Sequence, residues 1–142
     1  MRKTTSALLG AAIIASLGTG CSFQDTVAEP DSAGVATKLP EDTDKAKSVK
    51  QAEEFKAWLD KHGSGSQKDA GGRVQKIIGE WDDKTGTAFI STDINGGTTP
   101  VKDGMATAEA IAIAFNAYAE TEQGRVSIYD VFGNALITNA KF

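Results

Sequence analysis

The sequence predicts an α+β domain of two layers, in which a four-stranded, mainly antiparallel sheet is covered on one face by two helices. Two segments repeat apolar residues at helical spacing, and each is followed by two β-rich segments around a turn. The predicted order is therefore αββαββ. With 142 residues, of which 40% are hydrophobic, the chain is long enough for one domain with a buried core.

The first predicted helix begins near residue 45 and ends at Gly63. Its apolar residues recur every three or four positions, which is typical of an amphipathic helix packed on a core. These residues are Ala46, Val49, Ala52, Phe55, Trp58 and Leu59. We expect Thr43 or Asp44 to cap the start, and a flexible loop over the Gly- and Ser-rich residues 63–72.

Two β-rich segments follow this loop. Residues 74–81 and 87–94 lie on either side of the turn-forming residues 82–86. This arrangement predicts an antiparallel hairpin. The apolar spacing of the first segment also fits a short helix, which is the alternative.

The second predicted helix covers residues 105–122, which are rich in alanine and present a continuous apolar face. Gly124 is expected to end it. Residues 125–132 and 135–138 then predict a second hairpin around the turn Gly133-Asn134.

In this two-layer arrangement one face of the sheet has no helix to cover it. It is expected to carry one set of alternating strand residues, either the set below or its opposite-parity partners. The set is Phe89, Ser127, Tyr129 and Thr138. An uncovered face can bind a partner, so Tyr129 is a candidate contact, and Trp81 beside the acidic turn is a second one.

The N-terminus is typical of an export signal. Arg2 and Lys3 precede an apolar run from Ala7 to Leu17, and small residues then lead to Cys21. The run is shorter than the roughly 20 apolar residues that a membrane-spanning helix needs. We therefore expect residues 1–20 to be a cleaved signal peptide.

The residues around the only cysteine resemble a bacterial lipoprotein signal. Gly20 is the small residue that this signal has before its cysteine, although Leu17 stands four places ahead of Cys21 instead of the usual three. The resemblance implies a lipid on Cys21 and anchoring to the cell membrane on its extracytoplasmic face. Residues 18–20 also fit an ordinary signal peptidase, so a secreted protein with a free thiol is the alternative.

Residues 21–44 have the composition of a linker, with two of the chain's three prolines and many small or acidic side chains. They are expected to tether a domain at residues 45–142, and a docked arm is the alternative. Removal of residues 1–20 leaves 13 of the 15 basic residues against all 19 acidic ones, so the formal charge changes from −4 to −6. This charge argues against a nucleic-acid partner and against attraction to anionic lipids, which makes the attached lipid the predicted membrane contact.

The candidate catalytic residues show none of the spacings that hydrolases use. His62, the only histidine, adjoins Ser64 and Ser66, but the pattern G-x-S-x-G is absent. Residues 80–83 hold three carboxylates at a turn, where two groups facing each other across a cleft are not expected. We therefore predict no catalytic residue.

No metal or cofactor site is predicted either. Asp93, Asn95 and Asp103 surround a glycine-containing loop but depart from the spacing of a calcium-binding loop. A single cysteine and a single histidine exclude an internal disulfide and an all-protein Cys/His zinc site. The glycine-rich residues 63–72 lack the phosphate-binding patterns.

Three segments, residues 55–63, 111–115 and 126–134, resemble small exported proteins of actinobacteria whose function is not established. The resemblance covers most of residues 50–138 and implies an exported α+β domain. It transfers no active-site residue, because the shared segments are two helix faces and a hairpin.

The sequence thus predicts a lipid-anchored envelope protein with a small, non-catalytic binding domain. Its expected partner is an envelope or extracellular protein. The alternatives are an envelope hydrolase that uses the carboxylates at residues 80–83 and 93–103, and a secreted inhibitor or protective protein.

Overall fold

The computed structural model describes residues 37–96 and 101–142, which all fall within one compact unit. Its elements in chain order are α1 (Lys45–His62), α2 (Gly65–Gly71), β1 (Val74–Trp81), β2 (Thr85–Thr92), α3 (Gly104–Ala119), β3 (Gln123–Tyr129) and β4 (Ala135–Lys141). The predicted α+β class is confirmed. The order differs from αββαββ only by the additional helix α2.

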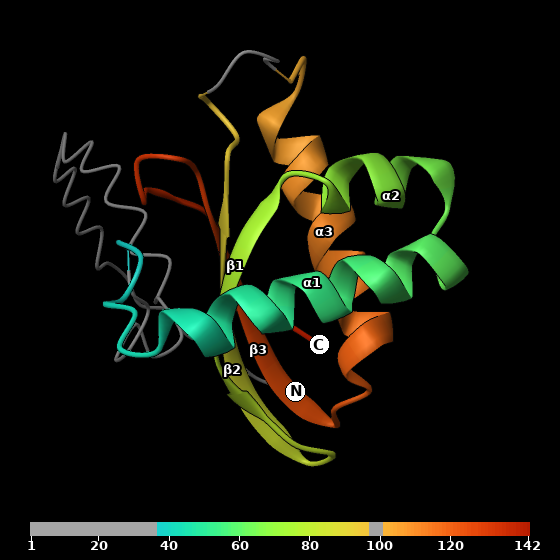
Figure 1. Cartoon of the computed structure of the whole chain (residues 1–142), viewed down its shortest axis with the longest axis vertical. Coiled ribbons are helices and arrows are strands. Elements are labelled where there is room, and N and C mark those ends of the chain that lie inside the picture. Colours follow the sequence, from blue (N-terminus) through green and yellow to red (C-terminus); the bar gives the residue numbers. More distant parts are fainter. Residues whose placement is uncertain (1–36, 97–100) are drawn as a thin grey trace, which may run out of the picture. The chain divides into compact units, whose positions relative to one another are not determined.

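The four strands form one mixed sheet in the order β1-β2-β3-β4 (Figure 1). The two hairpins, β1 with β2 and β3 with β4, are antiparallel as predicted. The central pair, β2 with β3, is parallel because α3 returns the chain to the starting end of the sheet before β3 begins. In Figure 1, α1 runs across β1. Helix α3 packs against β3 and β4.

Helix α1 begins as predicted, and Asp44 is its cap, since its carboxylate accepts a hydrogen bond from the Lys47 amide at 3.0 Å. Gly63 ends the helix, and its N–H donates to the Leu59 carbonyl at 2.7 Å. The predicted loop over residues 63–72 is wrong. Residues 65–71 form α2, whose start is closed by reciprocal hydrogen bonds between Ser64 and Gln67, a capping box.

Helix α3 begins at the cap Asp103 and ends three residues earlier than predicted. Glu120 terminates it in a left-handed conformation, with φ of 48°. Gly124, predicted as the terminating glycine, lies in β3 instead. There a Cβ atom would come within 2.3 Å of the Phe142 ring, so the site requires glycine for close packing.

Phe115 of α3 lies at the centre of the core. Its ring centroid is 5.5 Å from that of Phe55, 5.1 Å from that of Trp81 and 4.9 Å from that of Phe142. Aliphatic side chains from both layers complete this core. The main ones are Leu59, Val74, Ile77, Ala88, Ile90, Ala108, Ile111, Val126 and Ile128.

The described part of the predicted linker, residues 37–44, is docked on the domain. Lys38 forms a β-bridge with Asn134, and the Leu39 N–H donates to the Gly133 carbonyl at 3.0 Å. We call residues 37–44 the strap. The remaining N-terminal predictions, namely the signal peptide at residues 1–20, Cys21 and residues 21–36 of the linker, lie outside the described residues. Within the described ranges, no helix is long and apolar enough to cross a membrane.

Candidate functional site

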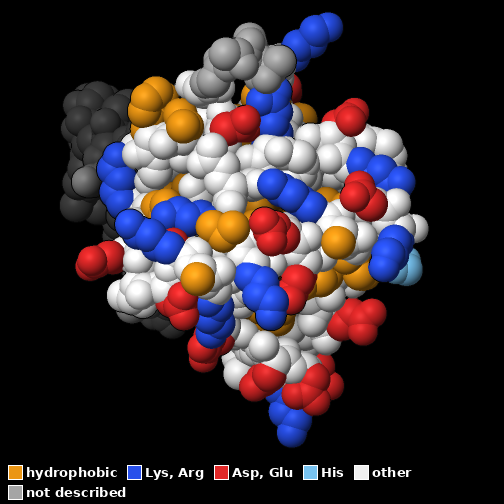
Figure 2. Space-filling model, viewed as in Figure 1, with side chains coloured by type: hydrophobic (Ala, Val, Ile, Leu, Met, Phe, Trp, Pro, Cys, Tyr) orange, Lys and Arg blue, Asp and Glu red, His pale blue; other side chains and the backbone are white. Residues whose placement is uncertain are grey.

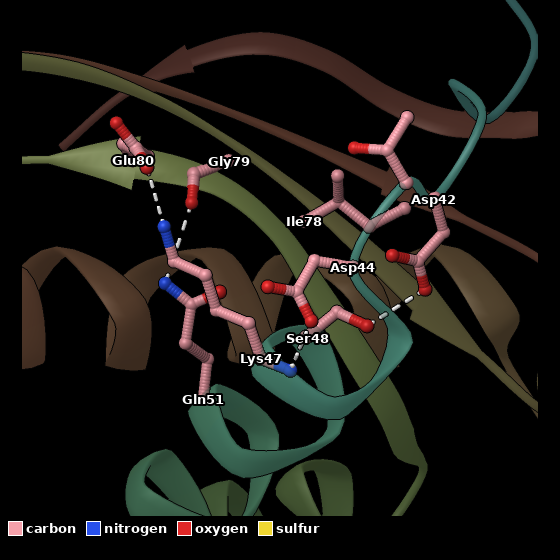
Figure 3. A pocket seen from close by; sticks show the side chains of 9 residues that line it. Asp42, Asp44, Lys47, Ser48, Gln51, Ile78, Gly79 and Glu80 are labelled. Carbon is pink, nitrogen blue, oxygen red and sulfur yellow. Dashed lines mark hydrogen bonds and ion pairs between the residues drawn. The ribbon is translucent and has the colours of Figure 1, made fainter.

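A groove with a volume of about 290 Å³ lies between the first half of α1 and β1, which is an edge strand of the sheet (Figure 3). The strap closes one end of it. Most of its lining residues have polar or charged side chains. The lining residues are Asp42, Thr43, Asp44, Lys47, Ser48, Gln51, Ile78, Gly79 and Glu80.

Gly79, which lines the groove, allows β1 to lie close against β2. Its φ is 119°, and a Cβ atom at this position would lie 2.0 Å from the Thr87 carbonyl oxygen of the neighbouring strand. Only glycine fits there. The amide of Gln51 donates to the Gly79 carbonyl at 3.3 Å. Helix α1 thus supplies a hydrogen-bond partner that a further strand would otherwise supply at this edge of the sheet.

Ion pairs join the two walls of the groove. The Lys47 ammonium contacts the Glu80 carboxylate, and this bond lowers the pKa of Glu80 below its usual value. Asp42 accepts from the Ser48 hydroxyl at 2.7 Å and pairs with Lys76 at 3.3 Å. The Ser48 hydrogen bond, followed by the Lys76 contact, lowers the pKa of Asp42 despite its burial.

These carboxylates are therefore ionised at neutral pH. A general acid in this groove would need a pKa raised towards neutrality, which is the opposite direction. The geometry fits binding of a polar segment that carries charges of both signs. Neither Asp42 nor Glu80 therefore has the raised pKa of a general acid.

The groove continues along α1 as a shallower depression of about 400 Å³ that reaches Trp81 and Tyr118. Trp81, a predicted contact residue, is half-buried and packs its ring against Phe115. Its remaining surface lines this depression together with Glu54. Trp81 therefore belongs to both the core and the candidate site.

Tyr129, the other predicted contact residue, is fully buried. The β2–β3 register pairs Phe89 with Ser127 and Ser91 with Tyr129, on the face opposite to the core residues Ile90 and Ile128. Burial raises the pKa of the Tyr129 phenol. Its ring is not accessible in this structure, so the candidate site contains Trp81 and not Tyr129.

His62 and its neighbouring serines do not form a catalytic arrangement. His62 is exposed at the end of α1, where its ring lies 5.1 Å from the Trp58 ring. The Ser64 hydroxyl instead accepts from the Gln67 amide at the start of α2. The hydroxyls of Ser64 and Ser66 lie 3.1 Å apart.

Three carboxylates of the hydrolase alternative, those of Asp82, Asp93 and Asp103, also have structural partners. Asp82 accepts from the amides of Lys84 and Thr85 at 2.9 and 2.8 Å, which closes the β1–β2 turn. Asp93 pairs with Arg73 at 3.2 Å. Asp103 caps α3. In residues 37–96 and 101–142, no three metal-binding side chains lie close enough together to hold an ion.

The Asp130 side chain in the β3–β4 turn, which the sequence patterns did not single out, is a well-organised polar group. One carboxylate oxygen accepts from the amides of Phe132 and Asn134, both at 2.9 Å, and the other accepts from the Asn95 side chain at 3.2 Å. Burial alone would raise the pKa of Asp130, but these hydrogen bonds outweigh it and lower the pKa. An aspartate three residues before Gly133, typical of turns, was the available signal.

Comparison with protein-family models, with curated proteins and with solved structures finds no match for this chain. The resemblance of the sequence to lipoprotein signals and to small exported proteins therefore stays a prediction.

Proposed function

We propose that this protein is an extracytoplasmic envelope protein, held at the cell membrane by a lipid on Cys21, whose domain binds another molecule without catalysis. The observation that carries the proposal is the position of the only cysteine, directly after a basic start, a short apolar run and small residues. A thiol at that position gains a role if it is acylated. In a released protein it would be an unpaired, oxidisable group.

The binding part of the proposal is supported by the groove between α1 and β1. Its walls offer the Lys47–Glu80 ion pair and the Gln51 amide next to an edge strand. The candidate catalytic side chains, in contrast, cap helices, close turns or form ion pairs. We propose an envelope or extracellular protein as the partner, recognised through a polar segment.

Detergent phase partitioning tests the anchor. We expect the wild-type protein, produced in a bacterium that processes lipoproteins, to enter the detergent phase, and Cys21→Ala to stay in the aqueous phase. A diacyl group contributes about 0.8 kcal/mol for each buried methylene, so the two proteins should separate almost completely. Equal recovery of both proteins in the aqueous phase would leave a secreted protein as the better account.

Capture from envelope extracts tests the groove. The exchange variant Lys47→Glu with Glu80→Lys keeps an ion pair across the groove but reverses its direction. We expect this variant to lose partners that the wild-type domain captures, whereas Lys61→Glu, at the exposed far end of α1, retains them. Equal capture by all three proteins would remove the groove from the account, and the absence of any captured protein would contradict a protein-binding role.

The structure bears differently on the two alternatives, a secreted inhibitor or protective protein and an envelope hydrolase. A secreted inhibitor or protective protein differs from the proposal only in its release and its partner. The hydrolase gains no support, because its candidate carboxylates have separate structural roles. Asp82 closes the β1–β2 turn, Asp93 pairs with Arg73, and Asp103 caps α3.

A further inference from the structure

The turn between β3 and β4 presents an exposed apolar tip. Phe132 is 70% exposed and Val131 is 40% exposed. Among the described residues, Phe132 is the most exposed large hydrophobic side chain. The others with comparable exposure, such as Ile113, are single residues on helix surfaces, where isolated apolar side chains are common. On the face drawn in Figure 2, charged side chains of both signs are spread widely, with only small apolar patches between them.

The backbone of this tip is held in place on several sides. The Asp130 carboxylate accepts from the Phe132 amide, and the Val131 amide donates to the Ile94 carbonyl at 2.9 Å. Gly133 takes up a positive φ of 74° and donates to the Asp130 carbonyl at 2.9 Å. The two apolar side chains are thus presented by a preorganised turn, so their contact with a partner costs little further backbone ordering.

The strap enters the domain at this same turn. The Ala135 amide donates to the Thr37 carbonyl at 3.2 Å, and the Lys38 ammonium donates to the Asn134 side chain. Thr37 is 16 residues from Cys21. For the linker that the composition of residues 21–36 predicts, 16 residues span on average about 20–24 Å. The strap is the described part nearest to Cys21 along the chain, and it docks on the β3–β4 turn. An anchor on Cys21 therefore keeps this turn within reach of the membrane.

We propose that Phe132 and Val131 insert into the boundary between headgroups and acyl chains of the membrane that carries the anchor, and so orient the domain on it. This inference rests on the proposed lipid anchor. The tethered turn meets the bilayer at a high effective concentration, so a contact too weak to hold a free domain suffices. The charges next to the tip also suit a lipid surface. Lys38 is an exposed cation, and the carboxylate of Asp130 is buried among hydrogen-bond donors.

The single cysteine allows a test that does not depend on lipidation in the cell. The chain from Cys21 to Phe142, the mature form in the proposed function, is coupled through Cys21 to maleimide-bearing lipid in phosphatidylcholine–phosphatidylglycerol vesicles. Phe132→Trp is compared with the matched control Ile113→Trp, which places the same probe at an exposed site on α3. Lipids brominated near the headgroup end of the acyl chain quench an inserted indole, and the coupled wild-type protein gives the background of Trp58 and Trp81.

We expect several-fold stronger quenching, with a blue-shifted emission, for Phe132→Trp than for Ile113→Trp. Equal quenching of the two variants would indicate random contact of a tethered domain, and absence of quenching in both would exclude insertion. Either result overturns the inference, as does stronger quenching of Ile113→Trp. Because the anchor is supplied chemically, these results are independent of the phase-partitioning result for Cys21→Ala, which tests the proposed function itself.

Discussion

Replacement of Asp130 by asparagine changes one carboxylate oxygen into an amide nitrogen, yet we expect it to destabilise the domain substantially. Asp130 is only 5% exposed, and its carboxylate accepts hydrogen bonds from two backbone amides and from the side chains of Asn95 and Asn134. In the variant, one amide oxygen can still accept from the backbone of the turn. Its NH2 group, however, faces two side chains that donate to this position.

The expected loss in the free energy of unfolding is about 2–3 kcal/mol, because hydrogen bonds to a charged group each contribute about 1.5–3 kcal/mol and only part of the set is removed. The side chains of Asn95 and Asn134 can rotate their amides to offer an oxygen, which limits the loss. Urea unfolding followed by circular dichroism at neutral pH measures it as a lower midpoint with an unchanged slope.

The pH dependence gives a second, independent check. The folded pKa of Asp130 lies below its value in the unfolded chain, so the unfolded state takes up the proton first as the pH falls. The stabilisation by Asp130 is therefore complete above the unfolded pKa of about 3.9 and is lost as the pH drops through the lower, folded value. The stability difference between the wild type and Asp130→Asn should shrink in that acidic range.

Asp82→Asn is the matched control. Asp82 also accepts from two backbone amides, those of Lys84 and Thr85, but it is exposed to water. Its replacement should destabilise the domain clearly less than that of Asp130, because solvent replaces part of what is lost. The reasoning is refuted if Asp130→Asn is no more destabilising than Asp82→Asn, or if its effect is the same at neutral and acidic pH.

Two further pairs of substitutions test how β1 and α2 are built. Gly79→Ala should lower the free energy of unfolding by more than about 2 kcal/mol, since it combines a φ of 119° with a Cβ 2.0 Å from the Thr87 carbonyl oxygen. Gly65→Ala, which has no atom near the added Cβ, should be neutral or slightly stabilising in the same urea titration. Ser64→Ala should cost about 0.5–2 kcal/mol, because it removes the acceptor of the Gln67 amide, and Ser64→Asp should restore most of it. Similar midpoints for Gly79→Ala and Gly65→Ala, or a wild-type midpoint for Ser64→Ala, would contradict these interpretations.

Periodicity and turn residues were sufficient to predict the two long helices, the four strands and both hairpins. They could not predict that β2 and β3 run parallel, because that depends on which way α3 carries the chain across the sheet. Helix α2 was not predicted, because the glycine content of residues 63–72 favours a loop although these residues contain the pattern of a helix start. The pair Ser64 and Gln67, three residues apart, forms the capping box that starts the helix.

The candidate site was predictable only in part. Trp81 was selected from its place beside an acidic turn, and it does line the depression at the end of the groove. Lys47, Gln51 and Gly79 come from two elements whose contact no spacing in the sequence reveals. Tyr129 was selected from strand alternation, which gives the face of a side chain but not what covers it.

The central claim of this account is the lipid on Cys21, and the mass of the N-terminal peptide of the protein extracted from membranes tests it most directly. The account predicts a peptide that begins at Cys21 and carries the added mass of a diacylglyceryl group, and no such product from Cys21→Ala. A mature protein whose first peptide retains residues before Cys21, or begins at an unmodified Cys21, would contradict it.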